Sequence, residues 1–219
     1  MKKYCTALAA SFLLLASCGG SSESSDTTLS DREEFAEAIK NDESTTTVKQ
    51  DRTETDDGRP IVTIPNEFDD PQDEILATYN AYHEALLVGM GMPEVNPDYA
   101  PLFELVVDPK ASNLRDVMVE FQDEGHVVID PSNSETSHSI RFVGAFNPEK
   151  TEGNTVTLID CHVDATEIRT LDGKIVNDEV VTFAKAVEMK VVDGAWKFSA
   201  QEVKERYEGV NECEEYANV

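Results

Sequence analysis

The residues best suited to chemistry in this sequence stand at alternate positions of one short segment, as Asp160, His162 and Asp164. Successive side chains of a β-strand point to opposite faces, so these three would share one face. A carboxylate beside an imidazole can form an acid–base pair, and both residue types are common zinc ligands. The simplest alternative is a place on the solvent face of an exposed strand. Val156 and Leu158 share this face and favour burial of its first half, so the pattern is compatible with all three arrangements.

A series of strands is expected to position these side chains, because the hydrophobic period changes to two after Gly125. Asp172-Gly173 and Asp193-Gly194 are typical of hairpin turns. The expected strands cover residues 126–130, 139–147, 156–168, 180–191 and 195–203.

Three helices are expected before the strands. The first begins at Asp70-Pro71, since Asp is a good N-cap and Pro suits the first turn. A short helix follows Asp98, and a third follows Asp108 and ends at Gly125. The apolar stripe of the first helix contains Ile75, Tyr79, Tyr82 and Leu86.

Helices followed by a run of strands predict an α+β fold, with the helices on one face of an antiparallel sheet. The pattern covers residues 70–208, a comfortable size for one domain. A C-terminal tail is expected at 209–219. Residues 18–69 are rich in Ser, Thr, Asp and Glu, which predicts a flexible tether with a short helix at 30–40.

The N-terminus has the features of an export signal. Lys2 and Lys3 precede an apolar run at 7–16, which is too short to span a bilayer of about 30 Å. The run ends in Leu-Ala-Ser before Cys18, which resembles the lipobox of bacterial lipoproteins. The resemblance implies removal of residues 1–17, a lipid on Cys18, and anchoring on the extracytoplasmic face of a membrane, at the cell surface or in a periplasm.

The net charge limits the classes of binding partner, and the cysteines indicate a possible disulfide. The chain has 18 Lys and Arg against 44 Asp and Glu, a net charge of −26, which disfavours binding to nucleic acid or to anionic lipid. An exported chain meets oxidising conditions, so Cys161 and Cys213 are expected to form a disulfide, with two separate thiols as the alternative.

The order of elements resembles the NTF2-like superfamily, in particular its exported actinobacterial members. The resemblance rests on the segments ATYNAY (77–82), NPDYAPL (96–102), VTLIDCHVD (156–164) and VVDGAWKF (191–198). It implies a sheet curled around the first helix into a cone, with a pocket inside, and dimers are common in the superfamily. This chain departs from many members because no strand is expected between its second and third helices. The implied pocket lining is Tyr79, Tyr82, Arg141, Asp160, His162 and Asp164.

Members of this superfamily include isomerases, hydrolases, cyclases and binding modules, so the fold alone does not imply a function. We expect a non-catalytic domain that binds a protein partner or a small apolar ligand, without a cofactor or a metal. The alternative is a small-molecule isomerase or hydrolase that uses Asp160 with Tyr79 or Tyr82, or with Arg141 and Asp164. His83 on the first helix is a further candidate for the pocket lining, although His83, His126 and His138 are scattered in the sequence and each alone is expected at the surface rather than as a ligand.

Overall fold

The computed structural model describes residues 53–54, 58–65, 67–144, 147 and 149–213. The predicted signal peptide at 1–17, the lipidation site Cys18 and the predicted helix at 30–40 lie outside the described residues. Within the described part of the chain, no helix is both long enough and apolar enough to cross a membrane.

The helices begin and end at the local signals of the sequence. Helix α2 spans Pro71–Met90, and the Asp70 carboxylate caps it by accepting a hydrogen bond of 2.9 Å from the backbone N–H of Gln72. Helix α3 is one turn, Ala100–Phe103, and helix α4 spans Lys110–Glu124. The last of these ends at Gly125, whose φ of 66° lies in the left-handed region that glycine adopts readily.

The strands form one main sheet and two smaller ones, and their named pairs are all antiparallel. The main sheet has the order β4-β5-β8-β9, with β4 at Ser137–Val143, β5 at Thr155–Asp164, β8 at Val181–Val192 and β9 at Ala195–Glu208. The smaller sheets contain β3 at His126–Ile129, β6 at Glu167–Thr170 and β7 at Ile175–Asn177, and β1 at Thr53–Glu54 with β2 at Pro60–Ile61.

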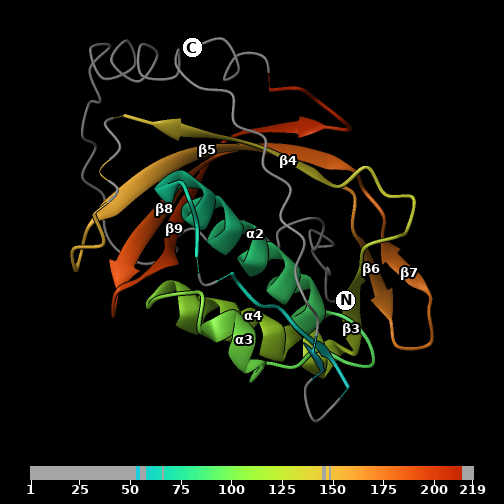
Figure 1. Cartoon of the computed structure of the whole chain (residues 1–219). Helices are drawn as coiled ribbons and strands as arrows, with labels where there is room; N and C mark the ends of the chain where they lie inside the picture. The colour runs from blue at the N-terminus through green and yellow to red at the C-terminus, as the bar shows by residue number, and fades with distance from the viewer. Residues whose placement is uncertain (1–52, 55–57, 66, 145–146, 148, 214–219) are drawn as a thin grey trace, which may run out of the picture.

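The helices lie together on one side of the curved main sheet, with α2 drawn along it (Figure 1). The predicted α+β class is therefore confirmed. The core lies between α2 and the sheet, where Tyr82 stacks on Phe198 of β9 with ring centroids 4.4 Å apart. The segment before α2 also packs on this core, since the Tyr99 hydroxyl donates a hydrogen bond of 2.6 Å to the Pro60 carbonyl.

The strand predicted at 156–168 is wrong as a single element. It divides into β5 and β6, which belong to different sheets. The break follows Asp164, whose Oδ1 accepts hydrogen bonds from the backbone N–H and the hydroxyl of Thr166. Such a side-chain turn competes with strand pairing. Strand β7 was not predicted, and β9 continues to Glu208 rather than ending at 203.

Candidate functional site

The inner face of β5 changes character along the strand. Val156 and Leu158 belong to the hydrophobic core, and Asp160 and His162 follow them on the same face. Asp160 has no exposed surface and His162 is 5% exposed. The solvent-face alternative for these two residues is therefore wrong, because the face that carries them is the one that packs toward α2.

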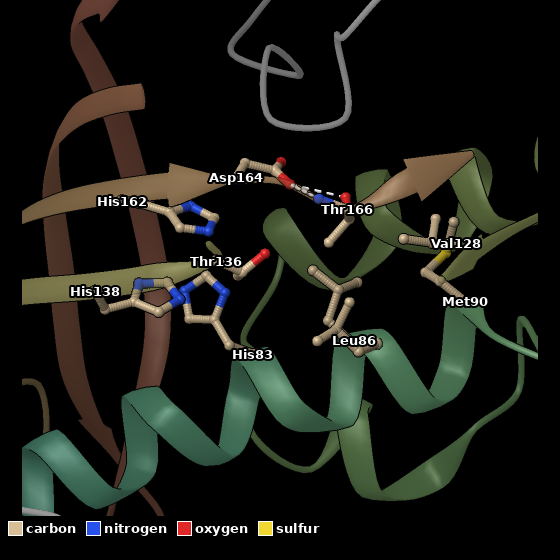
Figure 2. Close-up of a pocket in the computed structure, with 10 residues that line it drawn as sticks. His83, Leu86, Met90, Val128, Thr136, His138, His162, Asp164 and Thr166 are labelled. Carbon is tan, nitrogen blue, oxygen red and sulfur yellow. Dashed lines mark hydrogen bonds between the residues drawn. The ribbon is translucent and has the colours of Figure 1, made fainter. Parts of the chain in front are cut away.

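Two further histidines meet this face from other elements. His83 lies on α2, one turn after Tyr79, and their rings are in edge-to-face contact at 4.7 Å. His138 on β4 is the register partner of His162, and their rings stack with centroids 4.1 Å apart. The rings of His83 and His138 are 4.2 Å apart. The expectation that both lie at the surface is corrected: they converge on the inner face of the sheet (Figure 2).

Asp160 is the centre of the hydrogen bonds at this site. Its Oδ2 accepts a hydrogen bond of 2.8 Å from the Tyr79 hydroxyl and lies 3.0 Å from His138 Nδ1. A neutral His138 that donates from Nδ1 keeps a lone pair on Nε2. Asp160 therefore can hold the imidazole in one tautomer and one orientation.

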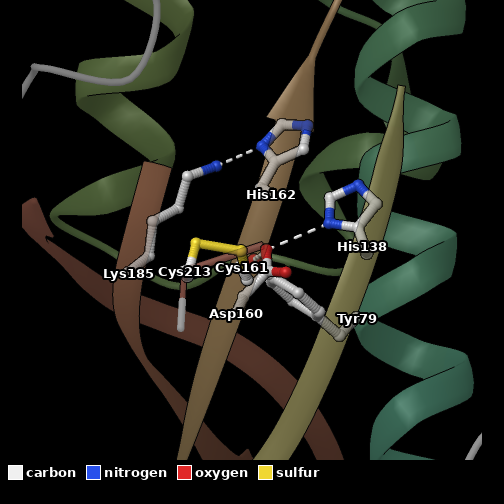
Figure 3. A network of polar contacts seen from close by, with 7 residues as sticks. All are labelled: Tyr79, His138, Asp160, Cys161, His162, Lys185 and Cys213. Carbon is white, nitrogen blue, oxygen red and sulfur yellow. Dashed lines mark hydrogen bonds and ion pairs between the residues drawn. A yellow bond between two sulfur atoms is a disulfide. The ribbon is translucent and has the colours of Figure 1, made fainter. Parts of the chain in front are cut away.

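Lys185 completes the group from β8, where it is the register partner of Asp160. The side chain has no exposed surface, and its Nζ contacts His162 Nδ1. His162 lies between Lys185 and His138 in Figure 3. We call the six residues Tyr79, His83, His138, Asp160, His162 and Lys185 the polar cluster.

Burial controls the protonation of the polar cluster. Burial lowers the pKa of His83 well below its usual value, and nearby cationic groups add to the effect. Burial and the adjacent Lys185 lower the pKa of His162 in the same way. Burial also lowers the pKa of Lys185 to about 8, although the Asp160 and Asp164 carboxylates oppose this shift. Desolvation, followed by the Asp160 charge, raises the pKa of Tyr79. At neutral pH, His83 and His162 are consequently neutral.

A small cavity opens beside the polar cluster and has a volume of about 60 Å³. This volume would hold roughly four water molecules or part of a small ligand. The apolar part of its wall consists of Leu86, Leu87, Met90 and Val128, and the polar part of His83, Thr136, His138, His162, Asp164 and Thr166. Figure 2 shows the three histidines gathered on one side of this space and the apolar side chains on another.

The predicted pocket residues have different positions. Asp160, His162 and Asp164 are brought together as expected from their alternation, and His162 and Asp164 line the cavity. Tyr79 and Tyr82 are fully buried in the core. Arg141 lies on the other face of β4 from His138, since its register is offset by an odd number of residues, and it does not line the cavity. The structure therefore does not bring Arg141 together with Asp160 and Asp164 inside the domain.

The structure contains the Cys161–Cys213 disulfide, with a Cα–Cα distance of 5.9 Å. Cys161 lies between Asp160 and His162 and points to the opposite face of β5 (Figure 3). The bond fixes the first residues of the predicted tail to the back of the sheet, where Gly209 also donates a backbone hydrogen bond of 2.9 Å to Val180.

Sequence reasoning offered His83 as a candidate for the pocket lining, and it missed His138 and Lys185. A signal existed for Lys185, which interrupts an alternating apolar row of β8 that includes Phe183 and Val187. The candidate position of His83 is confirmed, since it stands one turn after Tyr79 on α2 and lines the cavity. His138 had no local signal, because its place depends on the register between β4 and β5.

The arrangement is suited to two kinds of chemistry. The His138–Asp160 pair can move a proton at the cavity, because the carboxylate orients the ring. One ligand atom from each of His83, His138 and Asp160 also lies within 4.8 Å of the other two, a spacing from which a metal ion could be held. Comparison with known proteins finds no family model, no curated protein and no solved structure that matches the chain.

Proposed function

We propose that this chain is an extracytoplasmic lipoprotein whose NTF2-like domain binds a small ligand in the cavity beside the polar cluster, without transforming it. The observation that supports this most directly is the cavity itself, which has apolar side chains on one side and convergent polar side chains on the other. Ligand sites typically combine an apolar wall with a few fixed polar groups that orient the ligand.

The chemistry of the wall defines the ligand class. Leu86, Leu87 and Met90 offer contacts to an apolar group, while the histidine rings and Thr136 offer hydrogen-bond donors and acceptors. The volume of about 60 Å³ admits only a compact part of a molecule, and the rest would extend from the open mouth. The ligand is thus a small, mainly apolar molecule with one polar end group.

Native mass spectrometry of the protein extracted from its own host's membranes tests ligand binding. The expected result is a reproducible non-protein mass that Leu87→Trp removes by filling the cavity. Leu171→Trp is the matched control, because Leu171 is 49% exposed and does not line the cavity. A bare chain, or a chain that carries only a second polypeptide, would refute a small ligand and favour a protein partner or a homodimer.

A second candidate function is isomerase or hydrolase chemistry with His138 as the general base. The contact of 3.0 Å between His138 Nδ1 and Asp160 Oδ2 favours it, since it resembles the orienting contact of an acid–base pair. If the bound molecule is a substrate, chromatography coupled to mass spectrometry should show its conversion during incubation with the wild-type protein, either to hydrolysis products or to an isomer of equal mass and different retention. His138→Gln should leave the molecule unconverted. A molecule with unchanged mass and unchanged retention after incubation with the wild-type protein would leave the binding function in place.

The proposed membrane attachment depends on Cys18, which lies outside the described residues. Cys18→Ala should move the protein from the membrane fraction to the soluble fraction, because a diacylated cysteine is the only anchor the proposal provides. Cys5→Ala is the matched control, since Cys5 lies within the segment expected to be removed. A Cys18→Ala protein that still sediments with membranes would contradict the attachment.

A further inference from the structure

Three potential ligand atoms from three separate elements meet at one point of the polar cluster. His83 comes from α2, His138 from β4 and Asp160 from β5, and their ligand atoms all lie within 4.8 Å of one another. Helices and strands hold side chains more rigidly than loops do, which favours a defined coordination geometry. We propose that His83, His138 and Asp160 bind a divalent transition-metal ion, with zinc as the best fit.

Two buried atoms at this point have no hydrogen-bond partner. They are His83 Nε2 and Asp160 Oδ1, which belong to the short set of such side-chain atoms in the described part of the chain. Buried polar atoms are nearly always paired, and leaving one unpaired costs roughly 1–3 kcal/mol. Both atoms can offer a lone pair, so a single cation between them would satisfy both.

The neighbouring residues support this assignment. The Tyr79 hydroxyl donates to Asp160 Oδ2, which leaves Oδ1 available on the same carboxylate. Such hydrogen bonds to a ligating carboxylate orient it and tune the metal. Lys185 contacts His162 on the side away from His138, so its ammonium does not lie between the proposed ligands (Figure 3).

The donor set selects the metal. Two imidazoles and one carboxylate suit zinc and its neighbours in the transition series, whereas calcium and magnesium prefer oxygen donors. Zinc bonds are about 2.0–2.2 Å long, so ligand atoms that lie within 4.8 Å of one another need at most small side-chain rotations to reach one ion. Three protein ligands leave a fourth position open. His83 and His138 also line the cavity, so this position would face it.

The proposed metal binding does not depend on the small ligand. The identity of the group that occupies the open coordination position does rest on the proposed function. The polar end group of the ligand would occupy that position in place of water. A carboxylate end group, which can give zinc one oxygen ligand, is the class of ligand that fits this single position.

The test uses the full chain, purified in detergent, freed of metal with a chelator and titrated with Zn²⁺. We expect one ion per chain with a Kd below about 1 μM. His83→Gln and Asp160→Asn should each weaken binding by at least about 100-fold, since removing a ligand costs more than disturbing its supporting hydrogen bonds. His126→Gln should bind as the wild type does, because His126 pairs with Glu124 outside the cluster.

Co²⁺ provides a readout that does not depend on the variants folding. The wild-type chain loaded with Co²⁺ should show the intense visible absorption of a four-coordinate site. An octahedral spectrum, binding that exceeds or falls short of one ion, or a His83→Gln chain with wild-type affinity would overturn the metal site and favour a buried water. The native mass with chelator present separates the two proposals, because an organic mass that persists there keeps the ligand-binding function while the metal site fails.

Discussion

The inner face of β5 has two halves, which share one strand, one helix opposite and one disulfide behind. The first half is apolar and the second is polar. Val156 and Leu158 pack into the hydrophobic core, whereas Asp160 and His162 enter a hydrogen-bonded cluster that is equally buried. Burial alone therefore does not distinguish structural from functional positions in this domain. What differs is the free energy of burial. Burying the first pair is favourable, whereas burying the second pair is unfavourable unless hydrogen-bond partners offset it.

The largest effect is expected in the apolar half. Leu158→Ala should lower the free energy of unfolding by about 3 kcal/mol, because Leu158 has no exposed surface and its truncation leaves a cavity. Chemical denaturation measures this loss. Thr157→Ala on the opposite face should cost less than about 1 kcal/mol. If the two halves are separable, Zn²⁺ affinity of the folded Leu158→Ala chain stays within about twofold of wild type. A loss comparable to that of His83→Gln would show that the halves are one unit.

An intermediate effect is expected from pH in the polar half. Burial lowers the pKa of Lys185 to about 8, from 10.5 in the unfolded chain. Between these values the unfolded state binds more protons, so the contribution of Lys185 to stability rises with pH and falls again as pH drops toward 8. From pH 8 to about 9.5 the wild type should gain about 2 kcal/mol relative to Lys185→Met, since one pKa unit corresponds to 1.36 kcal/mol.

Urea denaturation of both proteins at several pH values measures this difference. Burial raises the pKa values of Tyr79 and Tyr82, and their ionisation opposes stability at higher pH. Both tyrosines are present in the wild type and in Lys185→Met, so their contribution cancels in the comparison. Parallel stability profiles would contradict the lowered pKa of the buried Lys185.

The smallest effect is expected where the halves meet. Tyr79→Phe removes the hydrogen bond to Asp160 but keeps the ring in the core, so it should cost about 1 kcal/mol. It should also lower Zn²⁺ affinity by about 10-fold, because it frees a carboxylate that the hydroxyl orients. Tyr82 stacks on Phe198 in the core, so Tyr82→Phe should leave the Zn²⁺ affinity unchanged. Equal Zn²⁺ affinities of the two variants would show that the Tyr79 hydroxyl does not orient Asp160.

The sequence was most informative where structure is decided locally. The Asp70 cap, the left-handed Gly125 and the alternation that places Asp160 with His162 all depend on neighbours a few residues away. The choice of inner face depends on α2 lying against one side of the sheet, which no short segment encodes. His138 reaches the cluster through its register with His162, so scattered histidines become one site only after pairing is fixed.

The division of the predicted 156–168 strand has a different, local origin. An alternating pattern continues through Asp164, but the hydrogen bonds from Thr166 to its carboxylate turn the chain into another sheet. The bend also places Asp164 and Thr166 at the edge of the cavity. A prediction based on period alone could not see this, because the period is preserved across the turn.

The Cys161–Cys213 bond requires a second event besides folding of the chain, namely the oxidation of two thiols. Asp160 and His162 flank a residue whose own side chain is tied through the back of the sheet to a position 52 residues later. A newly made chain whose thiols are still reduced has the same histidines but lacks this disulfide. Oxidation of the two thiols therefore ties the C-terminal segment to the back of the strand that carries Asp160 and His162, and reduction of the bond would release that segment.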